Sequence, residues 1–194
     1  MQGGDEDDTQ YGGHGDDSMQ GGSGDDTQYG GKGNDSMEGN VGNDTQYGGD
    51  DDDTMYGDRG NDTQYGGKGN DALYGGLGND TLYGDEGDDE LHMGQGGDVA
   101  YGGAGNDIFI FDMEETTDDD RSVIMDAQAG DSVRIYNLGY DIDSLGPSVV
   151  QQHGNDVRIW YSHNGEEHYF TLKDVSVDQL EYEPTQEFFM FYII

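Results

Sequence analysis

The stretch that decides the fold runs from Gly66 to Tyr83 and reads GGKGNDALY followed directly by GGLGNDTLY. Both halves fit the nonapeptide GGxGxDxUx, in which U is a large apolar residue. The same phase continues without an insertion from Gly3 to Ile110, which makes twelve units of nine residues. Such a period predicts a solenoid, in which each repeat is stabilised by stacking on its neighbours.

The sixth position of the nonapeptide is Asp in every unit. Chance could place some acidic residues there, but not twelve in register with glycines at fixed offsets. We therefore expect this position to bind a ligand. The twelve residues are Asp8, Asp17, Asp26, Asp35, Asp44, Asp53, Asp62, Asp71, Asp80, Asp89, Asp98 and Asp107.

The composition requires counter-charge for folding. The 194 residues include no cysteine, 36 glycines and 30% hydrophobic residues, and the formal net charge is −37. Little apolar burial would oppose chain entropy and charge repulsion, so a disordered acidic linker that binds cations diffusely is the alternative interpretation. The uninterrupted phase argues against it. This charge repels nucleic acid and attracts cations, and no apolar run is long enough to predict a membrane span.

Each nonapeptide predicts half of one coil. The first six positions are expected to form a glycine-rich turn with positive φ angles, and the last three, such as Thr81-Leu82-Tyr83, a short strand with its middle residue inward. Two units close a coil of 18 residues, and coils stack about 4.8 Å apart. Twelve units therefore predict about six coils.

Calcium is the expected cofactor. It takes six to eight oxygen ligands, and glycine turns offer backbone carbonyls beside a carboxylate, whereas Mg²⁺ needs stricter octahedral geometry. Turns on one edge recur every second unit, so an ion can lie between turn n and turn n+2. With five gaps on each edge, we expect about ten sites at most.

The repeats resemble the RTX calcium-binding repeats of bacterial secreted toxins, proteases, lipases, alginate epimerase R-modules and adhesins. The resemblance covers about 108 of the 194 residues. It extends more weakly through Asp107–Phe111, Val123–Asp126 and Gly130–Ile135, which are similar to the segment that closes the roll in serralysin-type and epimerase modules.

The resemblance implies an all-β fold, a parallel β-roll that is a right-handed β-solenoid. It also implies a secreted, extracellular bacterial protein that the type I secretion machinery exports by an uncleaved C-terminal signal. Calcium is scarce in the cytosol and plentiful outside, so it would start folding after export.

The inward positions divide the roll into two halves. They are Gln on one sheet and Met on the other up to residue 64, at Gln10, Met19, Gln28, Met37, Gln46, Met55 and Gln64. From residue 73 they are Leu73, Leu82, Leu91 and Phe109, with Ala100 as a small exception. Inward Gln departs from the family pattern. Stacked amides can bond from coil to coil but stabilise less than Leu, so we expect the N-terminal half to depend more on the metal.

An outward row of tyrosines follows one face, at Tyr11, Tyr29, Tyr47, Tyr65, Tyr83 and Tyr101. The row is either a stacking platform for a polysaccharide or ordinary cross-strand packing. Ice binding is disfavoured, because the third position is a mixture that includes His14, Ser23, Lys32 and Leu77.

Six units lack a glycine of the pattern, at Glu6, Asn40, Asp51, Asp58, Asp85 and Met93. A non-glycine residue at positive φ costs about 1–2 kcal/mol, and Asn and Asp tolerate it best. We therefore expect the lowest ion occupancy in the first unit, which contains Glu6.

The chain is predicted to divide into a calcium-binding roll at 1–111 and an antiparallel β cap at 112–194. Strands are expected at 122–126, 132–136, 148–152, 156–162 and 167–172, with a hairpin turn at Asn164-Gly165 and a helical turn near Val177. The ending Glu187–Ile194 resembles the tail of type I substrates or forms a last core strand. Because Met1-Gln2 continues the repeat phase, we expect a longer parent protein.

No catalytic constellation is evident, since the sequence contains no HExxH, GxSxG or Cys nucleophile. The first hypothesis is a module that folds on calcium binding and stabilises a larger secreted protein, whether hydrolase or adhesin. The alternative is a polysaccharide-binding module, similar to epimerase R-modules. The high negative charge counts against an anionic glycan.

Overall fold

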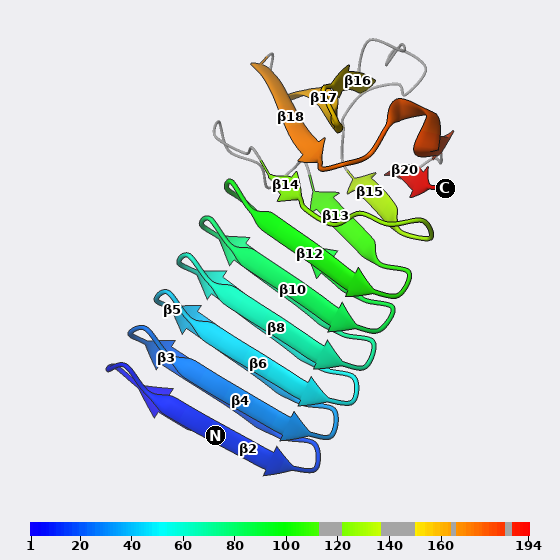
Figure 1. Ribbon diagram of the computed structural model, residues 1–194. Helices are drawn as coiled ribbons and strands as arrows, with labels where there is room; N and C mark the ends of the chain where they lie inside the picture. Colours follow the sequence, from blue (N-terminus) through cyan, green and yellow to red (C-terminus); the bar gives the residue numbers. More distant parts are fainter. Residues whose placement is uncertain (113–121, 137–149, 164–165, 185–187) are drawn as a thin grey trace.

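The computed structural model describes residues 1–112, 122–136, 150–163, 166–184 and 188–194. Parallel strands stack into a rod of coils, with a smaller group of strands at its C-terminal end (Figure 1). The expected all-β solenoid of about six coils is confirmed. No helix in the part of the chain that the structure describes is long and apolar enough to cross a membrane.

Successive strands alternate between two sheets. The first contains β1 (Gln2–Gly4), β3 (Ser18–Ser23), β5 (Ser36–Val41), β7 (Thr54–Arg59), β9 (Ala72–Leu77), β11 (Glu90–His92) and β13 (Ile108–Asp112). The second contains β2 (Thr9–His14), β4 (Thr27–Lys32), β6 (Thr45–Asp50), β8 (Thr63–Lys68), β10 (Thr81–Glu86) and β12 (Val99–Ala104). Paired residues lie 18 positions apart, as Tyr47 and Tyr65 do.

The strands are longer than the sequence predicts. Most span six residues, and they include the two glycines that the pattern assigns to a turn. In β4 the alternation holds as far as the first glycine, because Gln28 and Gly30 are buried while Tyr29 is exposed, and it breaks after Gly31, because Lys32 is exposed as well. Only three residues, such as 33–35, separate two strands. The expected six-residue turn is wrong, because the strand continues through the paired glycines.

The inward residues form the predicted core. Met19, Met37, Met55 and the later Leu, Ala and Phe positions are fully buried. Three inward glutamines, Gln28, Gln46 and Gln64, are equally buried and donate from Nε2 to the Oε1 of the preceding glutamine at 2.8–2.9 Å. Each also donates to a carbonyl oxygen of the opposite sheet, as Gln46 does to Tyr56 at 3.1 Å. The expected amide ladder is confirmed.

Both sheets continue into the C-terminal region. The first adds β15 (Ser132–Tyr136), parallel to β13, and then the antiparallel strands β20 (Phe188–Ile193) and β19 (Leu180–Pro184). The second adds β14 (Val123–Ile124) and β18 (Glu166–Leu172), both parallel to β12, and then the antiparallel β17 (Asp156–His163) and β16 (Val150–His153).

The sequence predicted these strands well. The bounds of the five expected strands agree within two residues, although β14 is only two residues long, and β19 was not predicted. The helical turn is η2 (Val177–Gln179), and the chain ending contains the strand β20 (Phe188–Ile193). Residues 113–121, the start of the 148–152 strand and the Asn164-Gly165 turn lie outside the described residues.

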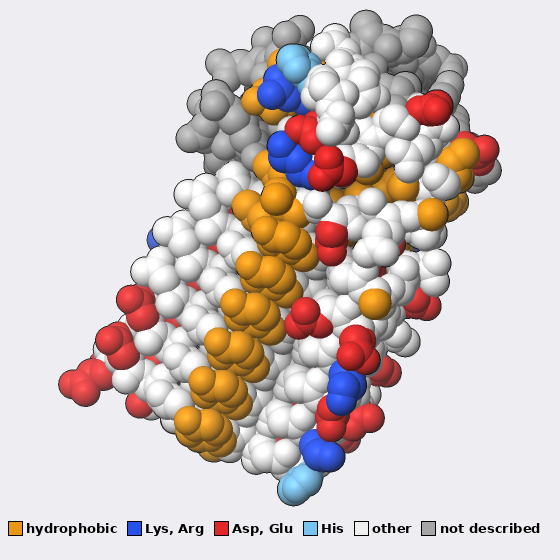
Figure 2. Space-filling view, in the orientation of Figure 1, with side chains coloured by type: hydrophobic (Ala, Val, Ile, Leu, Met, Phe, Trp, Pro, Cys, Tyr) orange, Lys and Arg blue, Asp and Glu red, His pale blue; other side chains and the backbone are white. Residues whose placement is uncertain are grey.

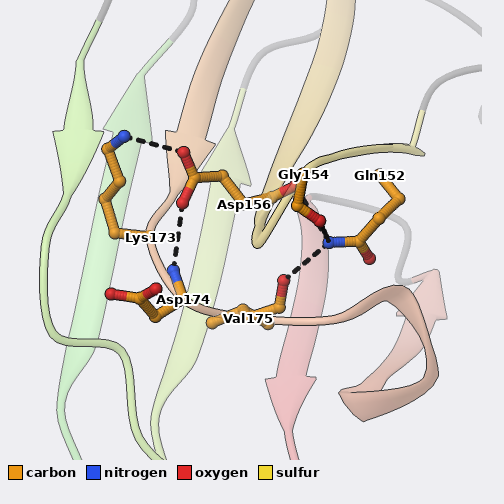
Figure 3. Close-up of polar contacts among 6 residues, drawn as sticks. All are labelled: Gln152, Gly154, Asp156, Lys173, Asp174 and Val175. Atoms are coloured by element: carbon orange, nitrogen blue, oxygen red, sulfur yellow. Dashed lines mark hydrogen bonds and ion pairs between the residues drawn. The ribbon is translucent and has the colours of Figure 1, made fainter.

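A polar tie connects the β16–β17 turn with the end of β18 (Figure 3). Lys173 Nζ donates to Asp156 Oδ2 at 2.7 Å, and the Asp174 N–H donates to Asp156 Oδ1 at 3.2 Å. Gln152 Nε2 donates to the carbonyl oxygens of Gly154 and Val175. These bonds fix the cap hairpin against the chain that leads to β19.

The amide ladder yields a stability prediction. In Gln46→Leu, the Oε1 of Gln28 and the Nε2 of Gln64 each lose a buried partner, so the free energy of unfolding should fall by about 1–3 kcal/mol. Replacement of all four inward glutamines by Leu removes donors and acceptors together and should be neutral or stabilising. Urea unfolding at saturating calcium measures both, and a quadruple variant less stable than Gln46→Leu would contradict the argument.

Candidate metal centre

The sixth-position carboxylates line the two edges of the roll where the chain turns between sheets. Ten of them, from Asp26 to Asp107, are at most 2% exposed, whereas Asp8 and Asp17 in the first coil are half-buried. Neighbours on one edge lie 18 residues apart, as the phase predicts. The structure thus separates the twelve predicted residues into two rows of six.

One oxygen of each buried carboxylate is held by the backbone. Asp44 Oδ1 accepts the N–H of Asp26 at 2.8 Å, and the same bond recurs along both rows at 2.7–3.0 Å. Each bond joins one coil to the next. These bonds therefore fix the position of each carboxylate in the folded roll.

The other oxygen, Oδ2, has no hydrogen-bond partner among the described residues in most of these carboxylates. Ten buried Oδ2 atoms make no hydrogen bond to the described residues, at Asp17, Asp26, Asp35, Asp44, Asp53, Asp62, Asp71, Asp80, Asp89 and Asp107. A buried acceptor without a partner costs about 1–3 kcal/mol, and more when it is charged. These ten Oδ2 atoms lie in rows along the two edges. Bound cations would give every one of them the partner that it lacks.

Burial raises the pKa of nine sixth-position carboxyls against the lowering effect of the backbone N–H bond, and neighbouring carboxylates add to the rise in most of them. The nine are Asp26, Asp35, Asp44, Asp53, Asp62, Asp71, Asp80, Asp89 and Asp107. The pKa reaches about 7 at Asp53, Asp62, Asp71, Asp89 and Asp107, and about 6 at Asp44 and Asp80. Without a metal the roll would therefore hold protons at these positions.

The first glycine of each unit is required for space. At Gly66 a Cβ would lie 2.4 Å from Asp71 Oδ2 and 2.6 Å from the carbonyl oxygen of Gly84, although the φ angle there is not in the left-handed region. The expectation that all turn glycines supply positive φ is therefore wrong for this position. It is confirmed for the second and fourth positions, such as Gly67 at 107° and Gly69 at 128°.

The non-glycine substitutions follow the expected tolerance. Asn40, Asp51, Asp58 and Asp85 adopt φ angles of 71–82°, whereas Glu6 is not among the residues with positive φ. The first unit therefore has a different turn geometry from the others. Its reduced occupancy stays a prediction.

Backbone oxygens must complete any calcium site. Within the described ranges, no group of three or more His, Cys, Asp or Glu side chains could hold a metal ion. Calcium needs six to eight oxygens, so carbonyl groups of the glycine turns would supply most ligands and Oδ2 atoms the charge. The exposed carbonyls of glycine-rich turns suit this role.

The sequence analysis missed a second ladder, at the fifth position. Asp25 Oδ1 accepts the N–H of Asn43 at 2.8 Å, and Asn61 Oδ1 accepts the N–H of Asn79 at 2.8 Å. These bonds run from one coil to the following coil, opposite in direction to those of the sixth position. The signal was present, since this position is Asp or Asn in eleven of the twelve units.

The ladders change where the roll meets the cap. Asp98 donates its N–H to the Ser122 hydroxyl at 3.1 Å, so a hydroxyl replaces the next carboxylate on that edge. On the other edge Asp131 Oδ1 accepts the N–H of Asp107, and its Oδ2 accepts that of Gln128. The cap therefore ends both rows with hydrogen bonds.

The tyrosine row forms as predicted. Its six rings stack at centroid distances of 4.7–4.9 Å with interplanar angles of 3–8°. Each inner ring thus covers the faces of its neighbours, which favours the packing interpretation for the ring faces. A role of this row in glycan binding stays a prediction.

One of three comparisons with known proteins bears on the repeats. The model of the RTX calcium-binding nonapeptide repeat matches four times, at residues 1–28, 29–64, 65–100 and 94–112. Among solved structures, the extracellular lipase LipA from Serratia marcescens matches with 17% identity and a TM-score of 0.22, over 92% of this chain and 38% of the lipase. So low a TM-score supports no conclusion here. A search of curated proteins finds no match.

The raised pKa values predict the pH dependence of the metal-free roll. An Asp whose folded pKa rises from 3.8 to about 7 stabilises the folded state below about pH 4, and this contribution is lost as pH rises through 7. Circular dichroism of metal-stripped protein should therefore show more β-structure at pH 5 than at pH 8. Replacement of Asp53, Asp71 and Asp89 by Asn should reduce the difference in β-structure between pH 5 and pH 8. The fifth-position control Asp52→Asn should leave this difference unchanged.

Proposed function

Because the chain belongs to the family of RTX calcium-binding nonapeptide repeats, we propose that its roll folds when calcium binds and thereby stabilises a larger secreted protein. The ten buried Oδ2 atoms without a partner carry this proposal. At neutral pH they make the metal-free roll unfavourable, and calcium turns each cost into a bond. Folding and metal loading are therefore one event.

The proposed ligands are the twelve sixth-position Asp residues, from Asp8 to Asp107, together with turn carbonyls. About ten ions at most would add about twenty positive charges to a chain of net charge −37. On the side of Asp98 that faces the cap, Ser122 stands where the next carboxylate would be. Asp98 therefore contributes least to ion binding in this scheme. The ions then compensate about half of the net charge.

RTX repeats are typical of extracellular bacterial proteins exported by type I systems. We place this chain among them, with residues 1–111 as the calcium-dependent roll and 112–194 as the cap that carries the secretion signal. Calcium affinities of about 10⁻⁴ to 10⁻³ M, usual for extracellular modules, would keep the roll unfolded in the cytosol. The proposed role is structural and does not involve catalysis.

Polysaccharide binding is the second candidate function. The observation in its favour is the complete tyrosine row on one face of the roll, which metal binding does not require. The other face carries only the shorter stack of Tyr56, Tyr74 and His92.

A calcium titration tests the first proposal. Circular dichroism should show a cooperative transition to β-structure below about 10 mM calcium, and no transition would defeat the proposal. Gly66→Ala should lower the number of bound ions by one or two, because the new Cβ meets Asp71 Oδ2 without any φ strain. Calorimetry gives the number of bound ions. An unchanged number in this variant would show that Asp71 is not a ligand.

The two halves of the roll should respond differently to calcium removal. Residues 3–64 enclose Gln and Met, whereas the rest encloses mainly Leu and Phe, which bury more apolar surface without a polar group. Hydrogen exchange at falling calcium should therefore lose protection first in residues 3–64. Equal protection in residues 66–110 and 3–64 at low calcium would contradict this order.

A further inference from the structure

A shallow groove of about 770 Å³ runs along the second sheet, across β2 to β12. Its floor consists of the second-position residues Gly13, Gly31, Gly49, Gly67, Asp85 and Gly103. One wall is formed by the third-position residues His14, Lys32, Asp50, Lys68 and Glu86. The tyrosine row borders the other side, because each tyrosine lies two residues before a floor residue on the same strand face.

Figure 2 shows this surface. A continuous stripe of hydrophobic side chains follows the rod, a mostly white strip interrupted by acidic side chains lies beside it, and a row of basic, acidic and histidine side chains lies beyond the strip. The groove is therefore straight and parallel to the rod axis. Its features repeat once per coil, at the 4.7–4.9 Å spacing of the stacked rings.

The charges along the wall compensate one another. Lys32 Nζ lies 3.4 Å from Asp50 Oδ2, and Lys68 Nζ lies 3.1 Å from Asp50 Oδ1. Asp50 and Glu86 both raise the pKa of Lys68, so Glu86 also acts on this lysine. The wall thus offers donors and acceptors in alternation, but no excess of positive charge.

Metal binding does not explain this surface. Both edges of the roll carry the same ladder of carboxylates, yet the third positions of the first sheet are Ser23, Val41, Arg59 and Leu77. That face has neither a complete tyrosine row nor alternating charges. Calcium binding would place the same demands on both faces. It therefore does not account for the regular rows of side chains on the second sheet.

We propose that this groove binds an uncharged, linear polysaccharide that lies along the rod axis. The coil spacing is close to the length of one sugar residue in an extended chain, so each coil can meet one sugar. Lysine donates to sugar hydroxyls, Asp50 and Glu86 accept from them, and the tyrosine hydroxyls can do both. A polyanion finds no unpaired positive charge here and meets a strongly negative protein.

This inference rests on the proposed function, because only the calcium-loaded roll holds the groove together. It differs from face-on stacking of sugars on tyrosine, since the ring faces are already covered. The ring edges and hydroxyls border the glycan instead.

Calorimetry at saturating calcium tests the proposal with cellohexaose, mannohexaose and laminarihexaose, and with a mannuronate hexamer as the anionic probe. At least one uncharged hexamer should bind more tightly than the anionic one. Joint replacement of Tyr47 and Tyr65 by Phe keeps the stacked rings but removes two hydroxyls, and should weaken binding at least about fivefold. The matched control, Tyr56→Phe with Tyr74→Phe on the other face, should bind as the unmodified protein does.

Asp50→Asn supplies a second, independent measurement. It removes the carboxylate that pairs with Lys32 and Lys68, so affinity for the mannuronate hexamer should rise. The proposal is overturned if no uncharged hexamer binds, if the unmodified protein prefers mannuronate, or if both tyrosine pairs weaken binding equally. Circular dichroism with calcium is recorded for every variant, so glycan binding lost with folding intact rejects the groove alone.

Discussion

The structure depends on carboxylates that are buried in rows with only half of their oxygens satisfied. In the ladder from Asp26 to Asp107, Oδ1 accepts a backbone N–H from the preceding coil, while Oδ2 makes no hydrogen bond to the described residues except at Asp98, where it accepts from the Ser122 hydroxyl. The first bond aligns successive coils, and the second oxygen makes their burial costly. Stacking alone would bring like charges together in a poorly hydrated turn. The fold is therefore complete only when something positive, a proton or a metal ion, occupies the edge.

The sequence predicted much of this arrangement because its period is strict. A nine-residue phase determines the two sheets, the 18-residue register and the inward identity of Gln46, Met55 and Leu73. It did not predict strand length, because glycine usually indicates a turn and here continues the strand. Nor did it distinguish the two reasons for glycine. Gly66 is needed for space beside Asp71, whereas Gly67 is needed for its backbone angle, and composition cannot separate them.

Other parts of the site were beyond sequence reasoning for physical reasons. The fifth-position ladder uses Asp and Asn interchangeably, because either side chain offers the oxygen that accepts the next N–H, so the acidic pattern alone concealed it. The end of the rows was also unpredictable. Ser122 and Asp131 lie 24 residues from their partners instead of 18, so the nine-residue phase no longer indicates which residues meet.

The two faces of the roll show which features are free to vary. Edges, glycines and carboxylates are under the same constraint in both sheets, because each coil must bury its carboxylates and stack on the next. Outward positions carry no such constraint, and they differ: one sheet has six stacked tyrosines beside the row of Lys32, Asp50 and Lys68, and the other has an irregular mixture. The two faces of the same repeats can be compared directly. Where the outward side chains of one face are more regular than folding requires, that regularity indicates a ligand.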